Sequence, residues 1–390
     1  MKIIDIKTHI VKIRYHKPEI WSLGVREGST PLILEIFTDE GITGVGEGRS
    51  PISTSSLEFL IHNDIKPLLI GEDPFNIERI SKKIFIKSGL ELCDDIGVYM
   101  KSGIDIALWD IIGKKLNVPL YKLIGGKYRE KVEFGYYLFR DDFNIMISDA
   151  KKAMERGFRL LKFKVGIYDA KDDVRTVKVL REALGPNVLL FCDANQAWSV
   201  GTAIKVLKQM EDYDIFAVEQ PTARKDFEGQ KYIRNSVNIP ISINEGVYTA
   251  EDAYNIISHG CADIIATDIH RPGGIMEAKK LAGIAEAAKI SVIGHSGGEL
   301  DIATAAYLHF FSSTPNFIYP NDSYYYHFED FLIKEPFKFE GPYIKVPEKP
   351  GLGIELDYSK LEKYKSKETF NPFDDREKIL KSEIPIFPKY

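Results

Sequence analysis

The chain has 390 residues, of which 44% are hydrophobic and 28% are charged, and its formal net charge is −5. This balance is typical of a globular protein of one or two domains, and the small negative charge gives no general attraction to nucleic acid or to a membrane surface. The three cysteines are widely spaced, no apolar run is long enough to span a membrane and the N-terminus lacks a signal-peptide core, so we expect a cytoplasmic protein with reduced thiols.

Residues 1–48 have the alternation of apolar and polar side chains that predicts antiparallel strands. Two such runs lie around Ile6 and Leu34, and the segment Tyr15–Thr30 between them, which contains glycines and aromatic residues, is predicted to be a loop. Helical periodicity follows over residues 53–69, 74–87 and 96–116, and Asn117-Val118-Pro119 ends the last helix. The pattern predicts an α+β first domain.

From about residue 130, short apolar runs alternate with helical stretches. The runs are Val132–Phe139, Leu160–Gly166, Val188–Asp193, Ile215–Glu219, Pro240–Glu245, Asp263–Asp268, Ser291–His295 and Phe317–Asp322. The helical stretches include Asp142–Arg156, Asp173–Leu184, Gly201–Met210 and Gly274–Ala288. Apolar strands separated by helices indicate a parallel sheet covered on both faces. Eight of them favour a (β/α)8-type barrel over an open sheet.

Polar residues end these runs at a regular interval. Successive intervals are 29 residues from Lys164 to Asp193, 26 to Glu219, 26 to Glu245, 23 to Asp268, 27 to His295 and 27 to Asp322. One βα unit has about this length, so these side chains should occupy equivalent places at the C-terminal ends of consecutive strands. In a barrel those ends surround a single mouth, where active sites form.

Asp193, Glu219 and Glu245 are acids on three consecutive strands. A single acid at a strand end often caps the following helix. Three acids that point into one mouth would repel one another unless a cation lay between them. Because they are carboxylates with no cysteine or histidine nearby in the pattern, we predict that they bind Mg²⁺.

Lys162 and Lys164 lie on the same face of an apolar strand. Lysines at this spacing are usually on a solvated face, but a strand covered on both sides has none, so we expect both to point into the mouth. Two ammonium groups beside a dication should depress the pKa of a lysine, as a general base requires.

His295 and Asp268 end neighbouring strands and could form a hydrogen bond. A lone histidine is more often a packed or surface residue, but a carboxylate partner would fix the tautomer of this imidazole and raise its basicity. Lys164 and His295 would then lie on opposite sides of the mouth, with the metal on the strands between them.

These motifs are similar to those of the enolase superfamily, in the mandelate racemase subgroup, and the resemblance covers nearly the whole chain. It rests on Lys162-Phe163-Lys164, Asp193-Ala194-Asn195-Gln196, Glu219-Gln220-Pro221, Asn244-Glu245-Gly246, Asp268 with Gly273-Gly274, His295, the run 103–110 and Leu123-Ile124-Gly125-Gly126. The resemblance implies a (β/α)7β modified TIM barrel, with an N-terminal α+β capping domain completed by the C-terminal segment. We place the capping domain at residues 1–128, the barrel at 129–330 and the returning segment at 331–390.

The resemblance also implies roles for individual residues. Lys164 would be a base, Lys162 a catalytic cation and His295 the second base, oriented by Asp268, with Mg²⁺ on the three acids. Capping loops over Tyr15–Thr30 and Arg49–Thr54 would close the site. Candidate substrate-binding residues are Trp21, Arg26, Arg49, Asn195 and Asp322, with Asn321 as the alternative to Asp322.

Three positions refine the resemblance. Asp268 stands where muconate-lactonising relatives carry a lysine, which favours the racemase and dehydratase branch. Many members end the eighth strand with a glutamate, whereas this chain has Asn321-Asp322 there. Gly297 replaces the asparagine that glucarate dehydratases carry two residues after the dyad histidine, which argues against glucarate as the substrate.

The resemblance therefore implies abstraction of the α-proton of a small carboxylate through an enediolate. We predict a Mg²⁺-dependent dehydratase of a monocarboxylic sugar acid, such as a pentonate or hexonate, that yields a 2-keto-3-deoxy acid. The alternative is a racemase or epimerase of a 2-hydroxy acid. A metal-binding protein without catalysis would be expected to lack at least one base or ligand, and a Schiff-base aldolase has no need of three successive acids. We expect no nucleic-acid or membrane partner, and an even-numbered homo-oligomer such as an octamer.

Overall fold

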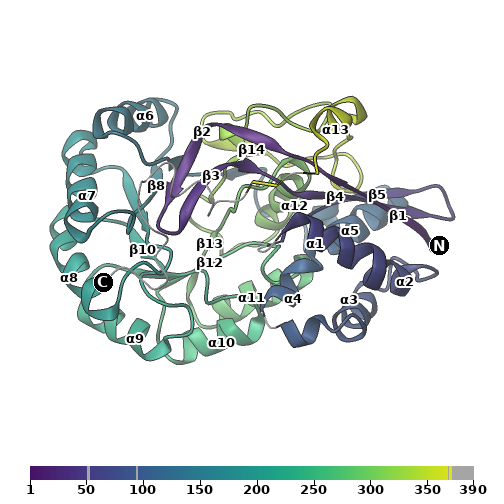
Figure 1. Cartoon of the computed structure of the whole chain (residues 1–390), viewed down its shortest axis with the longest axis horizontal. Helices are drawn as coiled ribbons and strands as arrows, with labels where there is room; N and C mark the ends of the chain where they lie inside the picture. The colour runs from purple at the N-terminus through teal and green to yellow at the C-terminus, as the bar shows by residue number, and fades with distance from the viewer. Residues whose placement is uncertain (51–52, 94, 368, 371–390) are drawn as a thin grey trace.

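The computed structural model describes residues 1–50, 53–93, 95–367 and 369–370. A parallel sheet of seven strands curls at the centre, helices surround it, and the N-terminal strands and helices pack at one side (Figure 1). Its strands are β7 (Tyr136–Leu138), β8 (Leu160–Lys164), β9 (Leu189–Asp193), β10 (Ala217–Glu219), β11 (Ile241–Ile243), β12 (Ile264–Thr267) and β13 (Ser291–Gly294). They neighbour one another in chain order and every pairing is parallel, as in the predicted modified TIM barrel.

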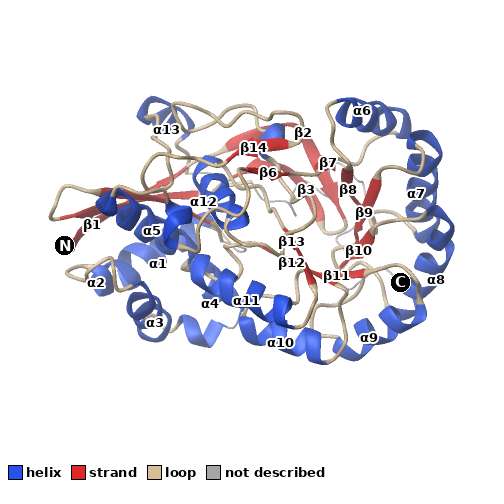
Figure 2. Ribbon diagram, turned by 180° about the vertical axis from the view of Figure 1, so that it is seen from behind, coloured by secondary structure: helices blue, strands red, loops and turns tan. Residues whose placement is uncertain are grey.

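The strands are buried on both faces, as their continuous apolar sequences predict; every residue of β8 is buried. Figure 2 shows the helices that cover the outside of the barrel as an arc around its strands. They are α6 (Phe143–Glu155), α7 (Ala170–Leu184), α8 (Val200–Met210), α9 (Phe227–Ser236), α10 (Ala250–Ser258), α11 (Ile275–Ala287) and α12 (Asp301–Ser312). Among the described residues, no helix combines the length and the apolar composition needed to cross a membrane.

The eighth predicted run, Phe317–Asp322, closes the barrel without forming a regular strand. Phe317 forms an isolated parallel bridge with Val292, and Asn321 forms another with Phe134. The backbone N–H of Asp322 also donates to the carbonyl of Gly294 over 2.8 Å. Pro320 lies between these contacts and has no N–H to donate, which keeps the ladder from becoming continuous.

The N-terminal part is an antiparallel sheet covered by helices. The sheet has the order β1 (Ile3–Ile10), β4 (Leu32–Thr38) and β5 (Thr43–Gly48). The helices are α1 (Thr54–Leu60), η1 (Ile61–Ile65), α2 (Lys66–Leu69), α3 (Ile77–Lys87), η2 (Leu90–Cys93), α4 (Asp95–Met100) and α5 (Ser102–Leu116). Helix α5 ends as predicted, because Asn117 adopts the left-handed conformation with φ 55°. It packs closely on β5, since a side chain at Gly46 would lie 2.0 Å from the carbonyl oxygen of Gly103.

The predicted loop Tyr15–Thr30 is instead a β-hairpin, so that prediction was wrong. Its strands β2 (Ile13–Trp21) and β3 (Gly24–Ser29) pair with each other in a separate two-stranded sheet. The pairing register shifts between Arg14 and Glu19, and this irregularity, which includes Pro18, hides the two-residue alternation of a strand. The hairpin reaches the mouth of the barrel, where the hydroxyl of Ser22 donates to the carbonyl of Asn195 over 3.4 Å.

The chain after the barrel contacts both halves of the molecule. Strand β14 (Tyr343–Lys345) pairs with β6 (Lys131–Glu133), and helix α13 (Tyr358–Tyr364) leads back to the N-terminal sheet. Lys365 forms a bridge with Val11, and the Tyr358 hydroxyl donates to Glu35 over 2.6 Å. Residues 371–390 of the predicted C-terminal segment lie outside the described residues.

Two buried carboxylates of the N-terminal part accept hydrogen bonds from the starts of two barrel helices. Glu47 of β5 accepts the N–H of Leu300 over 2.8 Å and that of Ala303 over 3.0 Å, at the start of α12. Asp105 of α5 accepts the N–H of Ile275 over 2.7 Å, at the start of α11. Carboxylates satisfy the free N–H groups at helix starts, so these contacts fix the N-terminal part against the barrel.

We therefore expect Glu47→Ala to lower the free energy of unfolding by about 2 kcal/mol or more, because two buried N–H groups lose their acceptor. Burial raises the pKa of Glu47 from 4.5 to about 8. The folded state thus binds a proton that the unfolded chain releases in this window, so the contribution of Glu47 to stability falls as the pH rises from 4.5 to 8.

Urea denaturation at both ends of this pH range measures the effect. Glu340→Ala, which removes a carboxylate whose side chain is 52% exposed, is the control and should change stability little. Equal stability of Glu47→Ala and the unaltered protein would contradict the prediction.

Candidate active site

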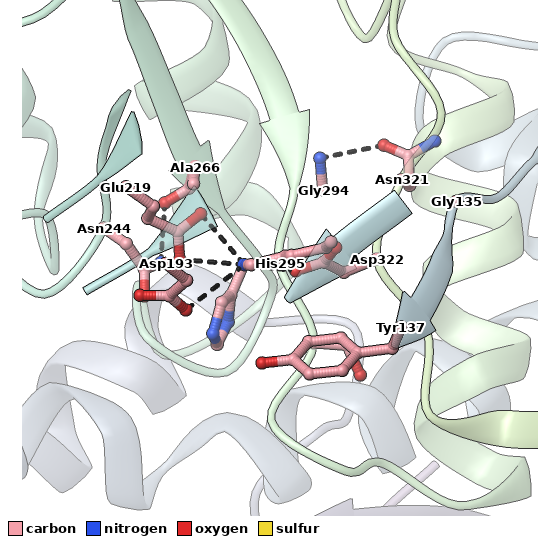
Figure 3. A network of polar contacts seen from close by, with 12 residues as sticks. Gly135, Tyr137, Asp193, Glu219, Asn244, Ala266, Gly294, His295, Asn321 and Asp322 are labelled. Carbon is pink, nitrogen blue, oxygen red and sulfur yellow. Dashed lines mark hydrogen bonds and ion pairs between the residues drawn. The ribbon is translucent and has the colours of Figure 1, made fainter. Parts of the chain in front are cut away.

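The parallel register brings the predicted strand-end residues together. Lys164 pairs with Asp193 across β8 and β9, and Asp193 pairs with Glu219 across β9 and β10. Asp268 and His295 directly follow β12 and β13, and Glu245 lies two residues after the end of β11. Figure 3 shows Asp193, Glu219, His295 and Asp322 converging on one region at the mouth of the barrel.

Lys162 is enclosed by acids at the centre of this cluster. Its Nζ donates to both carboxylate oxygens of Glu219 over 2.9 Å and to Asp322 Oδ2 over 2.6 Å. Burial opposes its charge, but Asp322 and Glu219 outweigh burial and raise its pKa above the ordinary value. Lys162 is thus a cation in this arrangement, and the depressed lysine pKa, which was expected beside a dication, stays a prediction.

Lys164 lies nearer the opening and contacts a different pair of acids. Its Nζ donates to Asp193 Oδ2 over 2.7 Å and lies 3.9 Å from Glu19 Oε1. Burial disfavours the ionised form of Asp193, yet Lys164 and Lys162 hold its pKa below the ordinary value. The ammonium group also lies 5.8 Å from the ring centre of Trp21, so the hairpin covers this side of the mouth.

His295 and Asp268 form the hydrogen bond that the sequence predicts. His295 Nδ1 lies 2.9 Å from Asp268 Oδ2, while Asp268 Oδ1 accepts the N–H groups of His270 and Arg271, both over 2.7 Å. With Asp268 ionised, Nδ1 carries the proton and Nε2 is available for proton transfer. Burial, together with the charge of Arg271, lowers the pKa of His295 well below its ordinary value, so the imidazole is neutral and its basicity is not raised as expected from the Asp268 contact alone.

The three acids suit a Mg²⁺ ion for two reasons: their carboxylate oxygens are the ligand type that it prefers, and one of these oxygens is buried without a partner among the described residues. Glu245 Oε1 accepts from Asn195 Nδ2 over 2.8 Å, whereas its buried Oε2 has no hydrogen-bond partner among the described residues. Such an oxygen beside Asp193 and Glu219 is a ligand that a hard cation prefers. In the described chain no three acid, histidine or cysteine side chains are arranged around one ion position, because Lys162 and Lys164 contact Glu219 and Asp193. Mg²⁺ binding here remains a prediction.

The predicted substrate-binding residues after β9 and in the run Phe317–Asp322 have different surroundings. Asn195 and Asp322 lie in the mouth, where they contact Glu245 and Lys162. Asn321 does not, because its Oδ1 accepts the N–H of Gly294 over 2.9 Å and its Nδ2 donates to the carbonyl of Glu133 over 3.2 Å. Both ends of its amide thus hold the barrel closed, and Figure 3 shows the contact with Gly294, so these contacts do not support the alternative assignment to Asn321.

Trp21, Arg26 and Arg49 come from the N-terminal part, and all three lie over the mouth. Arg26 pairs with Glu19 over 3.3 Å and stacks 5.5 Å above the ring of Trp21. Arg49 donates to Glu299 over 3.0 Å and approaches Gly297, where a side chain would lie 2.2 Å from the guanidinium. These contacts place the three candidates at the entrance, and their role in substrate binding stays a prediction.

Two residues at the mouth were not found by sequence reasoning. Glu19 is 1% exposed and accepts the Tyr324 hydroxyl over 2.5 Å. Tyr137, which is also 1% exposed, pairs with Lys162 across β7 and β8. The regular spacing of strand-end residues could have indicated Tyr137, because this residue precedes Lys164 by 27 residues. No comparable signal marks Glu19, which lies in the segment predicted to be a loop.

Family models match most of the chain. The model described as the mandelate racemase / muconate lactonizing enzyme N-terminal domain matches residues 3–125, and the model described as enolase C-terminal domain-like matches residues 146–360. The two matches together include every predicted catalytic and metal-binding residue.

Similar proteins differ in the reactions that their names state. A hydrophobic dipeptide epimerase from Enterococcus faecalis is 34% identical over 91% of this chain and 99% of its own length. An arabinonate dehydratase from Saccharolobus solfataricus is 29% identical over 85% of this chain and 90% of its own. The crystal structure of an N-succinyl Arg/Lys racemase from Bacillus cereus is 31% identical, with a TM-score of 0.88 over 94% of this chain and 98% of that one. A dipeptide epimerase from Enterococcus faecalis was crystallised with Mg and a dipeptide; it is 32% identical, with a TM-score of 0.84 over 91% of this chain and 100% of that one.

Proposed function

Because the chain belongs to the mandelate racemase and muconate lactonizing enzyme subgroup of the enolase superfamily, we propose that this enzyme is a Mg²⁺-dependent dehydratase of a monocarboxylic sugar acid. The observation that carries the proposal is the hydrogen bond of 2.9 Å between Asp268 and His295. These two residues follow β12 and β13, whereas Lys164 ends β8, so the three acids lie between the two bases. A carboxylate held at those acids has its α-carbon between two groups that can exchange protons.

The residues have separable tasks in such a reaction. Asp193, Glu219 and Glu245 would hold Mg²⁺, which when bound supplies positive charge for the developing enediolate. Lys162, a fixed cation, supports the same charge. One member of the pair Lys164 and His295 removes the proton from C2, and the other protonates the hydroxyl that leaves C3 as water. The resulting enol takes a proton at C3 and becomes the 2-keto-3-deoxy acid.

The polar lining supports a dehydratase over a racemase. A dehydratase must hold the hydroxyls of a polyol chain, whereas a racemase acts at a single carbon. Beyond the bases and acids, the mouth presents Glu19, Asn195 and Arg26, together with Arg49 and Asp322. The 29% identity to an arabinonate dehydratase agrees with this reading.

A racemase or epimerase is the second candidate, because the epimerase and racemase relatives reach 34% and 31% identity. The same two bases could return a proton to the opposite face of C2. Trp21, whose ring lies over Lys164 and Arg26, offers an apolar surface to such a substrate.

Reaction in deuterated buffer separates the two candidates. With aldonic acids and Mg²⁺, we expect a 2-keto-3-deoxy product that carries deuterium at C3, measured by NMR and mass spectrometry. If the remaining substrate instead incorporates deuterium only at C2, with mixed stereochemistry at that carbon, and no keto acid forms, the enzyme is a racemase or epimerase.

A further inference from the structure

The hydroxyl of Tyr137 is buried at the mouth and is not used by the chemistry described above. It makes no hydrogen bond with any described residue, although a buried hydroxyl normally has a partner. Figure 3 shows the ring extending from β7 with its hydroxyl end directed toward the side where Asp193 and His295 lie. The ring centre is 5.5 Å from Lys164 Nζ and 5.9 Å from Lys162 Nζ.

The surroundings of Tyr137 resemble a binding surface for a hydroxylated chain. Trp21, whose ring lies 5.8 Å from the same Lys164 Nζ, carries at Nε1 a second buried donor without a hydrogen-bond partner among the described residues. Glu19, whose carboxylate lies 3.9 Å from Lys164 Nζ, is an acceptor at the same side. A sugar hydroxyl both donates and accepts, so it can use both kinds of group, whereas an alkyl chain would leave them buried and unpaired.

The position of Tyr137 relative to the three acids indicates which part of a substrate would reach it. Strand β7 lies next to β8, while Glu219 ends β10 and Glu245 follows β11, two and three strands beyond β8. A substrate carboxylate held at the acids leaves the rest of its chain able to extend past Lys164 toward β7. Burial also raises the pKa of Tyr137 well above its ordinary value, so its hydroxyl stays a donor.

We propose that the Tyr137 hydroxyl donates a hydrogen bond to one hydroxyl of the substrate chain, beside Glu19 and Trp21, and so selects a hydroxylated carboxylate over its deoxy analogue. This inference rests on the proposed dehydratase function, because it takes the ligand to be a sugar acid with its carboxylate at the three acids.

Binding measurements test it without turnover. The probes are a five-carbon aldonate and its analogues that each lack one hydroxyl, titrated calorimetrically with Mg²⁺ into the His295→Asn protein, which should not consume them. We expect one analogue to bind about 10-fold more weakly than the aldonate, the size of a lost buried hydrogen bond. Adding Tyr137→Phe should abolish that difference without changing the melting temperature.

Tyr307→Phe is the matched control, because it also removes a buried hydroxyl without a partner among the described residues, but from α12. It should leave the discrimination unchanged. Equal binding of all probes, or discrimination that survives Tyr137→Phe, would overturn the inference. Discrimination that depends on Tyr137, with no keto acid formed by the unaltered enzyme, would support the inference and overturn the dehydratase function alone.

Discussion

Replacing His295 by asparagine, or Lys164 by alanine, should lower kcat by about 10²-fold or more, the usual contribution of a general acid or base. His295 has its Nδ1 held by Asp268 at 2.9 Å, so its neutral Nε2 faces the mouth. Lys164 is 7% exposed and is anchored by Asp193 at 2.7 Å. Lys162 lies on the same strand as Lys164, but its ammonium group is held between Glu219 and Asp322 and is not free to replace it.

Steady-state assays of purified variants with saturating Mg²⁺ measure this effect. Lys178→Ala and His259→Asn, which change residues on the outer helix α7 and at the end of α10, are controls and should retain full activity. Asp268→Asn should also slow the reaction, because an amide oxygen accepts from Nδ1 less strongly than a carboxylate does. A kcat near that of the unaltered enzyme for either His295→Asn or Lys164→Ala would refute the assignment of the pair.

The positions of these residues could be predicted because barrel geometry repeats along the chain. Each βα unit returns the backbone to the same end of the sheet, so a regular interval between polar residues becomes proximity in space. Lys164 and Asp193 are 29 residues apart in the sequence and 2.7 Å apart in the structure. Residue type then limits the chemistry: carboxylates indicate a cation, and an aspartate beside a histidine indicates a proton carrier.

Glu19 could not be predicted by the same argument. It lies on a hairpin whose irregular register hides the alternation of a strand, and its burial depends on Tyr324, which is 305 residues away in the sequence. The orientation of Asn321, the alternative to Asp322, is set by contacts of a related kind. This residue occupies the expected interval, but the hydrogen-bonding needs of the barrel backbone at Gly294 and Glu133 determine where its amide points.

Removal of divalent cations should abolish activity, and added Mg²⁺ should restore it. The reason is electrostatic. Asp193, Glu219 and Glu245 are buried at adjacent strand ends, and a substrate carboxylate brought beside them adds further negative charge. Lys162 and Lys164 provide two positive charges within hydrogen-bond distance of Asp193 and Glu219, whereas Glu245 Oε2 has no partner in the described chain. Substrate binding without a further cation would therefore be unfavourable.

The measurement is an assay after EDTA treatment and gel filtration, with and without added Mg²⁺, together with the melting temperature as a function of Mg²⁺ concentration. A bound ion stabilises the folded state, so the melting temperature should rise with Mg²⁺. Glu245→Gln should keep the fold but require at least about 10-fold more Mg²⁺ for half-maximal activity, the lower end of the loss expected when a metal site is perturbed. Glu251→Gln, on the outer helix α10, is the matched control and should need no more Mg²⁺ than the unaltered enzyme. Full activity in the metal-free protein would contradict the role of the three acids, because the two lysines alone would then suffice to hold the substrate carboxylate.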